Sequence, residues 1–343
     1  MYSESDIDGA VTAGVLSPQM AAAFRNYIAN SRSTPAVDEE HFRLLTGFND
    51  IFVSIALCLA LFAIGQIGWL AFQPLGGIVV AAASWLLAEY FTRKRRMALP
   101  SILLLAAFAG SFIAITAGIL AAWSVDLSPA TRNLVAAGTA LVVAGAAWAH
   151  WQRFMVPITV AAGAAALGGM VVALANLAFP TNWTIDYIII GAVGLCVFAL
   201  AMWWDMSDRE RRTRRSDVAF WLHLAAAPLI AHPLFNLLGV FNNNVSIATA
   251  VIVLLLYLAF AFVALAVDRR ALLVSGLIYV GYALYSLVEK SGLVELTAAV
   301  ACFIIGSALL MLSVYWHQMR SIVVGYLGEV RHRLPPVQTT VPA

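Results

Sequence analysis

Residues 75–123 read LGGIVVAAASWLLAEYFTRKRRMALPSILLLAAFAGSFIAITAGILAAW. In this stretch two apolar runs, Leu75–Tyr90 and Leu99–Trp123, flank a basic cluster at Arg93–Arg96. A helix needs about 20 mostly apolar residues to cross roughly 30 Å of hydrocarbon. The stretch therefore predicts two membrane-spanning helices joined by a short basic loop.

The rest of the chain repeats this pattern. Of its 343 residues, 62% are hydrophobic and 11% are charged, whereas soluble domains are about half apolar and about a quarter charged. The apolar residues gather in ten runs: Ile51–Phe72, Leu75–Tyr90, Leu99–Trp123, Leu134–Trp151, Val156–Phe179, Ile185–Trp204, Val218–Leu238, Ser246–Val267, Ala271–Val288 and Leu293–Trp316. We therefore predict an all-α fold, a polytopic transmembrane helix bundle of about ten spans.

The basic residues predict the orientation of these spans. Eighteen of the twenty Lys and Arg residues lie before the first run, after the last run, or in every second gap between runs. Only Arg132 and Lys290 fall in the other gaps. Lys and Arg close to a span are retained on the cytoplasmic side of the membrane. Both termini and the basic loops are therefore expected in the cytoplasm.

Two short helices are expected before the first span, over Ser5–Ala13 and Pro18–Ala29, followed by a linker at Ser31–Pro35. Ser17 is a favourable N-cap, and proline suits the first turn that follows it. A hairpin of this size buries too little core to be stable alone. We expect it to dock on a partner protein, on a second copy of the chain, or on the membrane face.

A short interfacial helix is expected after the last span. Apolar residues recur there on one helical face: Ile322, Val323, Tyr326, Leu327 and Val330. The predicted domains are the hairpin with its linker (1–49), the transmembrane domain (50–316), and the cytoplasmic tail (317–343).

Small residues recur every four positions in two predicted spans: Gly110, Ala114 and Gly118 in the third, and Ala164 with Gly168 and Ala165 with Gly169 in the fifth. Small side chains at this spacing let the backbones of neighbouring helices approach closely in a membrane. We therefore expect these positions to be helix–helix contacts.

Polar residues at membrane depth concentrate in the seventh predicted span, which contains His223, His232 and Asn236 together with Pro228 and Pro233. Each proline removes a backbone donor and frees a carbonyl four residues earlier, so a broken helix with the two prolines as hinges is predicted. Transporters often build a midplane site from broken helices, and a histidine can couple a proton to a conformational change. We therefore interpret the two histidines and Asn236 as candidate substrate-binding or proton-coupling residues.

Two further candidates for this site are Tyr279 and Tyr282 in the ninth predicted span. Tyrosines and histidines can also be packing contacts between helices. His223 and His232 are nine positions apart, so they face opposite sides of a straight helix. The packing alternative therefore stays open for each of these residues.

We find no motif for catalysis, metal binding or a cofactor. The chain has no His-Glu-x-x-His, Gly-x-Ser-x-Gly or Walker-type sequence. Its cysteines, Cys58, Cys196 and Cys302, lie in separate apolar runs. We therefore expect neither an enzyme nor a metalloprotein. Nucleic acid is not expected as a partner, because the basic residues are dispersed among short loops.

The layout of the chain resembles a known family. Gly14-Val-Leu-Ser-Pro-Gln-Met-Ala-Ala-Ala23 lies in the hairpin, Phe48-Asn-Asp50 leads into the first span, and Leu334-Pro-Pro336 lies in the tail. With the spans rich in small residues, these segments are similar to the domain-of-unknown-function 2157 type of bacterial membrane protein. The resemblance implies a location in the bacterial inner membrane and supplies no activity. The span number also resembles drug/metabolite-type permeases, although no residue-level repeat supports that likeness.

Two functions are consistent with these observations. The first is a permease-type carrier that moves a small solute by alternating access, with the seventh span contributing to the site. The alternative is a non-transporting membrane scaffold or sensor whose cytoplasmic hairpin binds a partner. The expected partners are the lipid bilayer and, at the hairpin, a second copy of the chain or a cytoplasmic protein.

Overall fold

The computed structural model describes residues 4–31, 48–179, 182–209, 211, 213–240, 246–290 and 297–336. Within these ranges every regular element is a helix, as the sequence predicts. The chain forms two compact units, one containing the first two helices and the other containing all later ones. Most of the predicted linker, the start of the predicted tenth span and the end of the tail lie outside the described residues.

The first unit contains the expected hairpin of α1 (Glu4–Thr12) and α2 (Pro18–Ser31). Ser17 Oγ accepts a hydrogen bond of 3.1 Å from the backbone N–H of Met20, which confirms the predicted N-cap. Gly14 has a positive φ of 72°, a conformation that glycine adopts without strain, and it turns the chain between the two helices.

The second unit contains one helix for each of the ten predicted spans. These helices are α3 (Phe48–Ala71), α4 (Gln73–Ala88), α5 (Ala98–Ala122), α6 (Pro129–Phe154), α7 (Ile158–Ala178), α8 (Trp183–Ser207), α9 (Arg214–Leu237), α10 (Ile247–Val267), α11 (Ala271–Lys290) and α12 (Thr297–Val314). The π-helix η1 (Glu89–Lys94) extends α4, and α13 (Trp316–Tyr326) and the 3-10 helix η2 (Gly328–Arg333) follow α12.

Eight helices of the described chain, α3 to α10, are long and apolar enough to cross a membrane. The apolar part of α11, Leu272–Tyr285, is shorter than a full span. Cys302–Val314 passes the same test only together with α13, and the two segments are bent by 74°. These helices are consistent with a multi-pass membrane protein, while ten crossings and the cytoplasmic location of both termini stay predictions.

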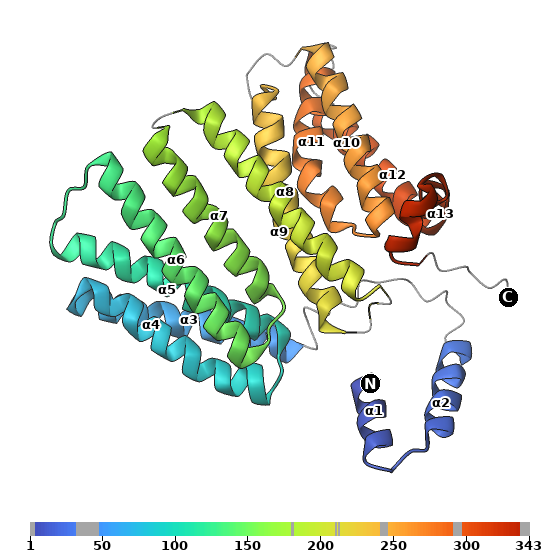
Figure 1. Ribbon diagram of the computed structural model, residues 1–343, viewed down its shortest axis with the longest axis horizontal. Helices are drawn as coiled ribbons and strands as arrows, with labels where there is room; N and C mark the ends of the chain where they lie inside the picture. Colours follow the sequence, from blue (N-terminus) through green and yellow to red (C-terminus); the bar gives the residue numbers. More distant parts are fainter. Residues whose placement is uncertain are drawn as a thin grey trace. The chain divides into compact units, whose positions relative to one another are not determined.

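Within the second unit, most helices pack against their neighbours in the sequence. Figure 1 shows this succession from α3–α5, through α6 and α7 and then α8 and α9, to α10–α13. Helix α9 packs against α7, α8 and α11, and it is the most buried of the eight candidate spans. It therefore connects the earlier helices of this unit to the later ones.

The predicted small-residue contacts are confirmed at some positions and not at others. A Cβ atom at Gly118 would lie 2.7 Å from the backbone of Gln73, and one at Gly168 would lie 2.6 Å from the Val193 side chain. Both distances are too short for a real contact, so these glycines permit close helix packing. The prediction is wrong for Gly110 and Gly169, because a Cβ atom there would meet nothing within 4 Å in the described chain.

Candidate functional site

Helix α9 begins at the N-cap Thr213, whose side chain accepts a hydrogen bond from the backbone N–H of Arg215. It then continues as one α-helix through Pro228 and Pro233 to Leu237. The predicted break is therefore wrong, although a hinge role for the two prolines stays a prediction. Prolines are tolerated inside membrane helices where neighbouring helices and local adjustments satisfy the freed backbone groups.

Close packing by α8 supports this uninterrupted helix. Gly194 of α8 lies against the backbone of Leu229, where an added Cβ atom would be only 2.8 Å from the Leu229 carbonyl carbon. Leu229 is the residue whose carbonyl Pro233 leaves without its helical donor. A larger residue at position 194 would therefore separate α8 from α9 beside the second proline.

Three of the predicted site residues meet near the end of α9 that is distant from its basic N-terminal turn. His232 Nδ1 lies 2.8 Å from Tyr279 Oη of α11, within hydrogen-bond distance. Asn236 Nδ2 donates to the backbone carbonyl of His232 at 2.9 Å, and Tyr187 Oη of α8 donates to Asn236 Oδ1 at 3.4 Å. We call these four residues, His232, Asn236, Tyr279 and Tyr187, the His232 cluster.

The His232 cluster combines a buried anchor with exposed polar groups. The Tyr279 ring is buried and stacks on Phe235, with ring centroids 4.6 Å apart. His232 is exposed and Asn236 is half-buried. Tyr282, the fifth candidate, packs against the same apolar core beside Tyr279. The cluster therefore presents imidazole and amide groups from a candidate membrane span, α9, and the imidazole is within hydrogen-bond distance of a hydroxyl of α11.

The structure places His223 away from this cluster. His223 is fully buried, and its Nε2 lies 2.8 Å from Asp205 Oδ2 in the last turn of α8. The ring of Phe198 packs against it at 5.2 Å. Its Nδ1 has no hydrogen-bond partner among the described residues. His223 therefore lies apart from the His232 cluster, on another face of α9 as the nine-residue spacing predicts, and a substrate or proton-coupling role for it stays a prediction.

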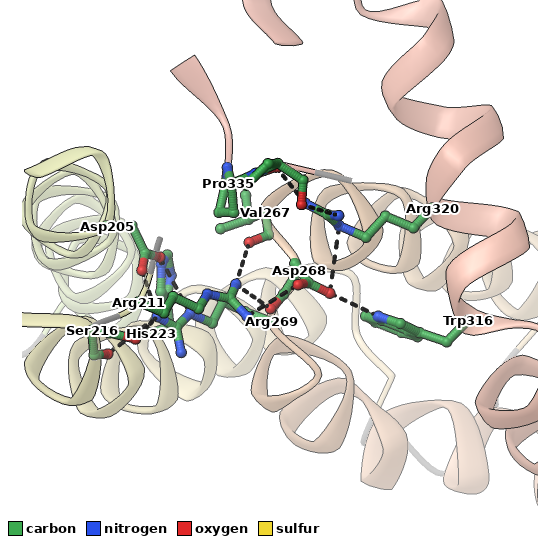
Figure 2. Close-up of polar contacts among 11 residues, drawn as sticks. Asp205, Arg211, Ser216, His223, Val267, Asp268, Arg269, Trp316, Arg320 and Pro335 are labelled. Carbon is green, nitrogen blue, oxygen red and sulfur yellow. Dashed lines mark hydrogen bonds and ion pairs between the residues drawn. The ribbon is translucent and has the colours of Figure 1, made fainter. Parts of the chain in front are cut away.

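His223 belongs instead to a buried ionic network that the sequence did not indicate (Figure 2). Arg269, in the turn between α10 and α11, donates from Nη2 to Asp205 Oδ1 at 2.5 Å and from Nε to Asp205 Oδ2 at 3.3 Å. The same Nη2 donates to the backbone carbonyl of Ser216 at 3.1 Å. Asp205 and Arg269 are each 2% exposed, so water and salt weaken the attraction between them much less than for a surface pair.

A second ion pair joins the same two regions, but here the aspartate is in the turn between α10 and α11. Arg211, from the loop between α8 and α9, donates from Nη1 to Asp268 Oδ2 at 3.0 Å and from Nη2 to the Asp268 carbonyl at 2.9 Å. The end of α8 and the loop after it therefore supply one aspartate and one arginine, and the turn between α10 and α11 supplies the two residues that pair with them. We call Asp205–Arg269 and Arg211–Asp268 the double ion pair.

Asp268 also holds the C-terminal part of the second unit. Trp316 Nε1 donates to Asp268 Oδ1 at 2.8 Å, and Arg320 Nε lies 3.5 Å from the same oxygen. Arg320 also donates from Nη2 to the backbone carbonyl of Pro335 at 2.7 Å (Figure 2). Asp268 has a positive φ of 60°, a conformation that aspartate tolerates better than most residues.

The chemistry of the double ion pair differs from that of the His232 cluster. Its carboxylates are already matched by guanidinium groups, and its residues are distant in the sequence, so it fixes the end of α8 and the loop after it against the turn between α10 and α11. Within the described residues, no group of three or more His, Cys, Asp or Glu side chains could hold a metal ion. Asp205 and Asp268 border the basic loops in the sequence, and that adjacency is the signal that could have revealed them.

Comparison of the chain with family models, with curated proteins and with solved structures finds no match. The resemblance to the domain-of-unknown-function 2157 type therefore stays a prediction.

Proposed function

We propose that the protein is a permease-type carrier of a small solute and that the His232 cluster contacts the solute or a coupled proton. The observation that carries the proposal is the exposed His232 inside a candidate membrane span, hydrogen-bonded to Tyr279 of another helix. Ionisable side chains are costly at membrane depth and commonly mark substrate or proton pathways. Its position therefore favours a functional role over simple packing.

The composition of the cluster favours an uncharged polar solute. The imidazole, amide and phenol groups of these four described residues can each donate and accept hydrogen bonds without carrying a formal charge in their neutral forms. A solute with hydroxyl or amide groups could exchange hydrogen bonds with Tyr187, Asn236 and Tyr279. Such an exchange would alter the contact of α9 with both α8 and α11.

The location of the cluster supports access from one side. His232 lies five residues before the end of α9, roughly 8 Å along the helix axis. The basic loop between α8 and α9 lies at the other end of α9, and so does the double ion pair, because Arg269 contacts Ser216 in the first turn of the helix. With the basic loops in the cytoplasm of a bacterial inner-membrane protein, the His232 cluster would open toward the outer side.

Removing the Tyr279 hydroxyl is expected to reduce solute flux by up to about tenfold. Tyr279→Phe keeps the ring on Phe235 but loses the hydrogen bond to His232, a contact worth about 0.5–1.5 kcal/mol. The measurement is efflux of a mixture of amino acids, sugars, organic acids and nucleosides from proteoliposomes, followed by mass spectrometry.

Tyr257→Phe is the matched control for this experiment. The Tyr257 hydroxyl is buried on α10 and makes no hydrogen bond within the described chain, so its removal should leave flux unchanged. Equal flux in wild type and in both variants would contradict a role for the His232 cluster. Absence of efflux for every solute of the mixture would count against the carrier.

A scaffold or sensor is the second candidate, and the hairpin favours it. Ile7 and Ala21 are buried, while Val15 and Met20 are 76% and 60% exposed. Arg25 Nη2 and Asp8 Oδ1 join α1 to α2 at 2.7 Å. The hairpin thus has a defined fold that leaves apolar side chains open to a partner. The flux experiment separates the two functions, because a scaffold has no flux that Tyr279→Phe could reduce.

A further inference from the structure

Helix α13 follows α12 after a sharp change of direction. The two segments are bent by 74° at Tyr315, which is neither in α12 nor in α13. If α12 is roughly perpendicular to the membrane, α13 lies close to the membrane plane. A short helix in that position is at the boundary between lipid headgroups and acyl chains when its faces have suitable polarity.

The side chains of α13 and of Tyr315, which directly precedes it, fall into three stripes. The first stripe, Trp316, Arg320 and Val324, is buried against the bundle. The second, Tyr315, Met319, Ile322 and Tyr326, is apolar and 41%, 43%, 52% and 84% exposed. The third, between them on the helix circumference, consists of Gln318, Ser321 and Gly325, all of which are exposed. These positions follow the helical repeat, so each stripe occupies its own face.

We infer that α13 is a lipid-contact helix whose exposed apolar stripe inserts into the membrane interface. The exposed apolar surface of α12, at Leu310, Met311 and Val314, precedes the stripe directly in the chain. Lipid is the occupant that suits both surfaces, because one of them belongs to an apolar helix of spanning character. Tyr315 and Tyr326 at the two ends of the stripe suit the headgroup layer.

The inward face of α13 determines which side meets lipid. Trp316 and Arg320 contact Asp268, so the helix cannot turn its apolar stripe toward the bundle without breaking these contacts. The sequence placed Val323 and Leu327 on the lipid face beside Ile322 and Tyr326. In the structure Val323 packs against the buried core of α10 and α11 instead. This lipid contact is independent of the proposed transport.

Nitroxide labels at adjacent positions of α13 test the inference. In the full chain, with Cys58, Cys196 and Cys302 replaced, single cysteines are introduced as Ile322→Cys and, for the matched position on the polar stripe, Ser321→Cys. The protein is reconstituted in vesicles of phosphatidylcholine and phosphatidylglycerol. Collision with oxygen, which concentrates in lipid, and with a nickel chelate, which stays in water, is measured by power saturation.

We expect the label at position 322 to collide several-fold more with oxygen relative to the nickel chelate than the label at position 321. Equal access of the nickel chelate to both labels would place α13 in water and overturn the inference. Low access of both reagents to position 322 would show that protein covers the stripe, through a partner or a second copy, and would also overturn it. Met319→Cys and Gln318→Cys repeat the comparison if either first variant fails to fold.

Discussion

Replacing Arg269 with alanine is expected to destabilise the folded bundle by about 3–5 kcal/mol. The guanidinium of Arg269 contacts both carboxylate oxygens of Asp205 and the carbonyl of Ser216, and all of these groups are buried. Without it, Asp205 stays buried, and His223 is the side-chain partner that the described residues still provide. The midpoint of thermal unfolding in detergent should fall by roughly 5–10 °C.

Arg270→Ala is the matched control for Arg269→Ala. Arg270 is the next residue, but its guanidinium lies over the Trp316 ring at 4.9 Å, a contact worth about 0.5–2 kcal/mol. Arg269→Lys should give an intermediate result, because lysine keeps the charge and loses the two-pronged geometry. Equal unfolding midpoints for Arg269→Ala and Arg270→Ala would show that the buried Asp205–Arg269 pair contributes no more to the stability of the fold than the contact of Arg270 with Trp316.

Replacing Asp268 with asparagine is expected to loosen α13 while most of the bundle stays folded. Asparagine tolerates the left-handed backbone of position 268, but it removes the charge that faces Arg211 and Arg320. Breaking buried ionic contacts of this kind costs about 3–5 kcal/mol. Amide hydrogen exchange in α13 should therefore become at least about a hundredfold faster if 3 kcal/mol is lost locally.

The Trp316→Phe variant should have a smaller effect on hydrogen exchange in α13 than Asp268→Asn. Phenylalanine fills most of the buried space, keeps an aromatic ring near Arg270, and loses the indole N–H that donates to Asp268. A single lost hydrogen bond should accelerate exchange in α13 by roughly tenfold or less. Exchange in α13 that is the same in wild type and Asp268→Asn would mean that Asp268 does not hold this helix.

The helices were predictable from the sequence because a membrane leaves few alternatives for a long apolar run. Each predicted run overlaps one of the helices α3 to α12, and α5 begins and ends within a residue of the predicted Leu99–Trp123. Helix α9 differs from the prediction because it is continuous, although its two prolines were expected to break it. The sequence pattern does not show that Gly194 brings α8 against the backbone beside Pro233. Such support depends on tertiary packing.

The candidate site was predictable in part, for a similar reason. His232, Asn236 and Tyr279 stand out as polar residues in apolar runs, and the structure brings them together. Tyr187 did not stand out, because a tyrosine near the end of a span is expected at the headgroup layer. Asp205 was missed because a carboxylate beside a basic loop is usually exposed. Its burial depends on Arg269, 64 residues later in the chain.

Thiol labelling at position 232 tests the central claim, that the His232 cluster is reached by water inside the membrane. In a chain without its native cysteines, His232→Cys is compared with Leu258→Cys, a position of α10 that is 64% exposed on an apolar helix. We predict that a small membrane-impermeant thiol reagent modifies position 232 from outside intact cells and leaves position 258 unmodified. Protection of both positions, from outside cells and in inverted vesicles, would contradict a water-accessible site and with it the proposed carrier.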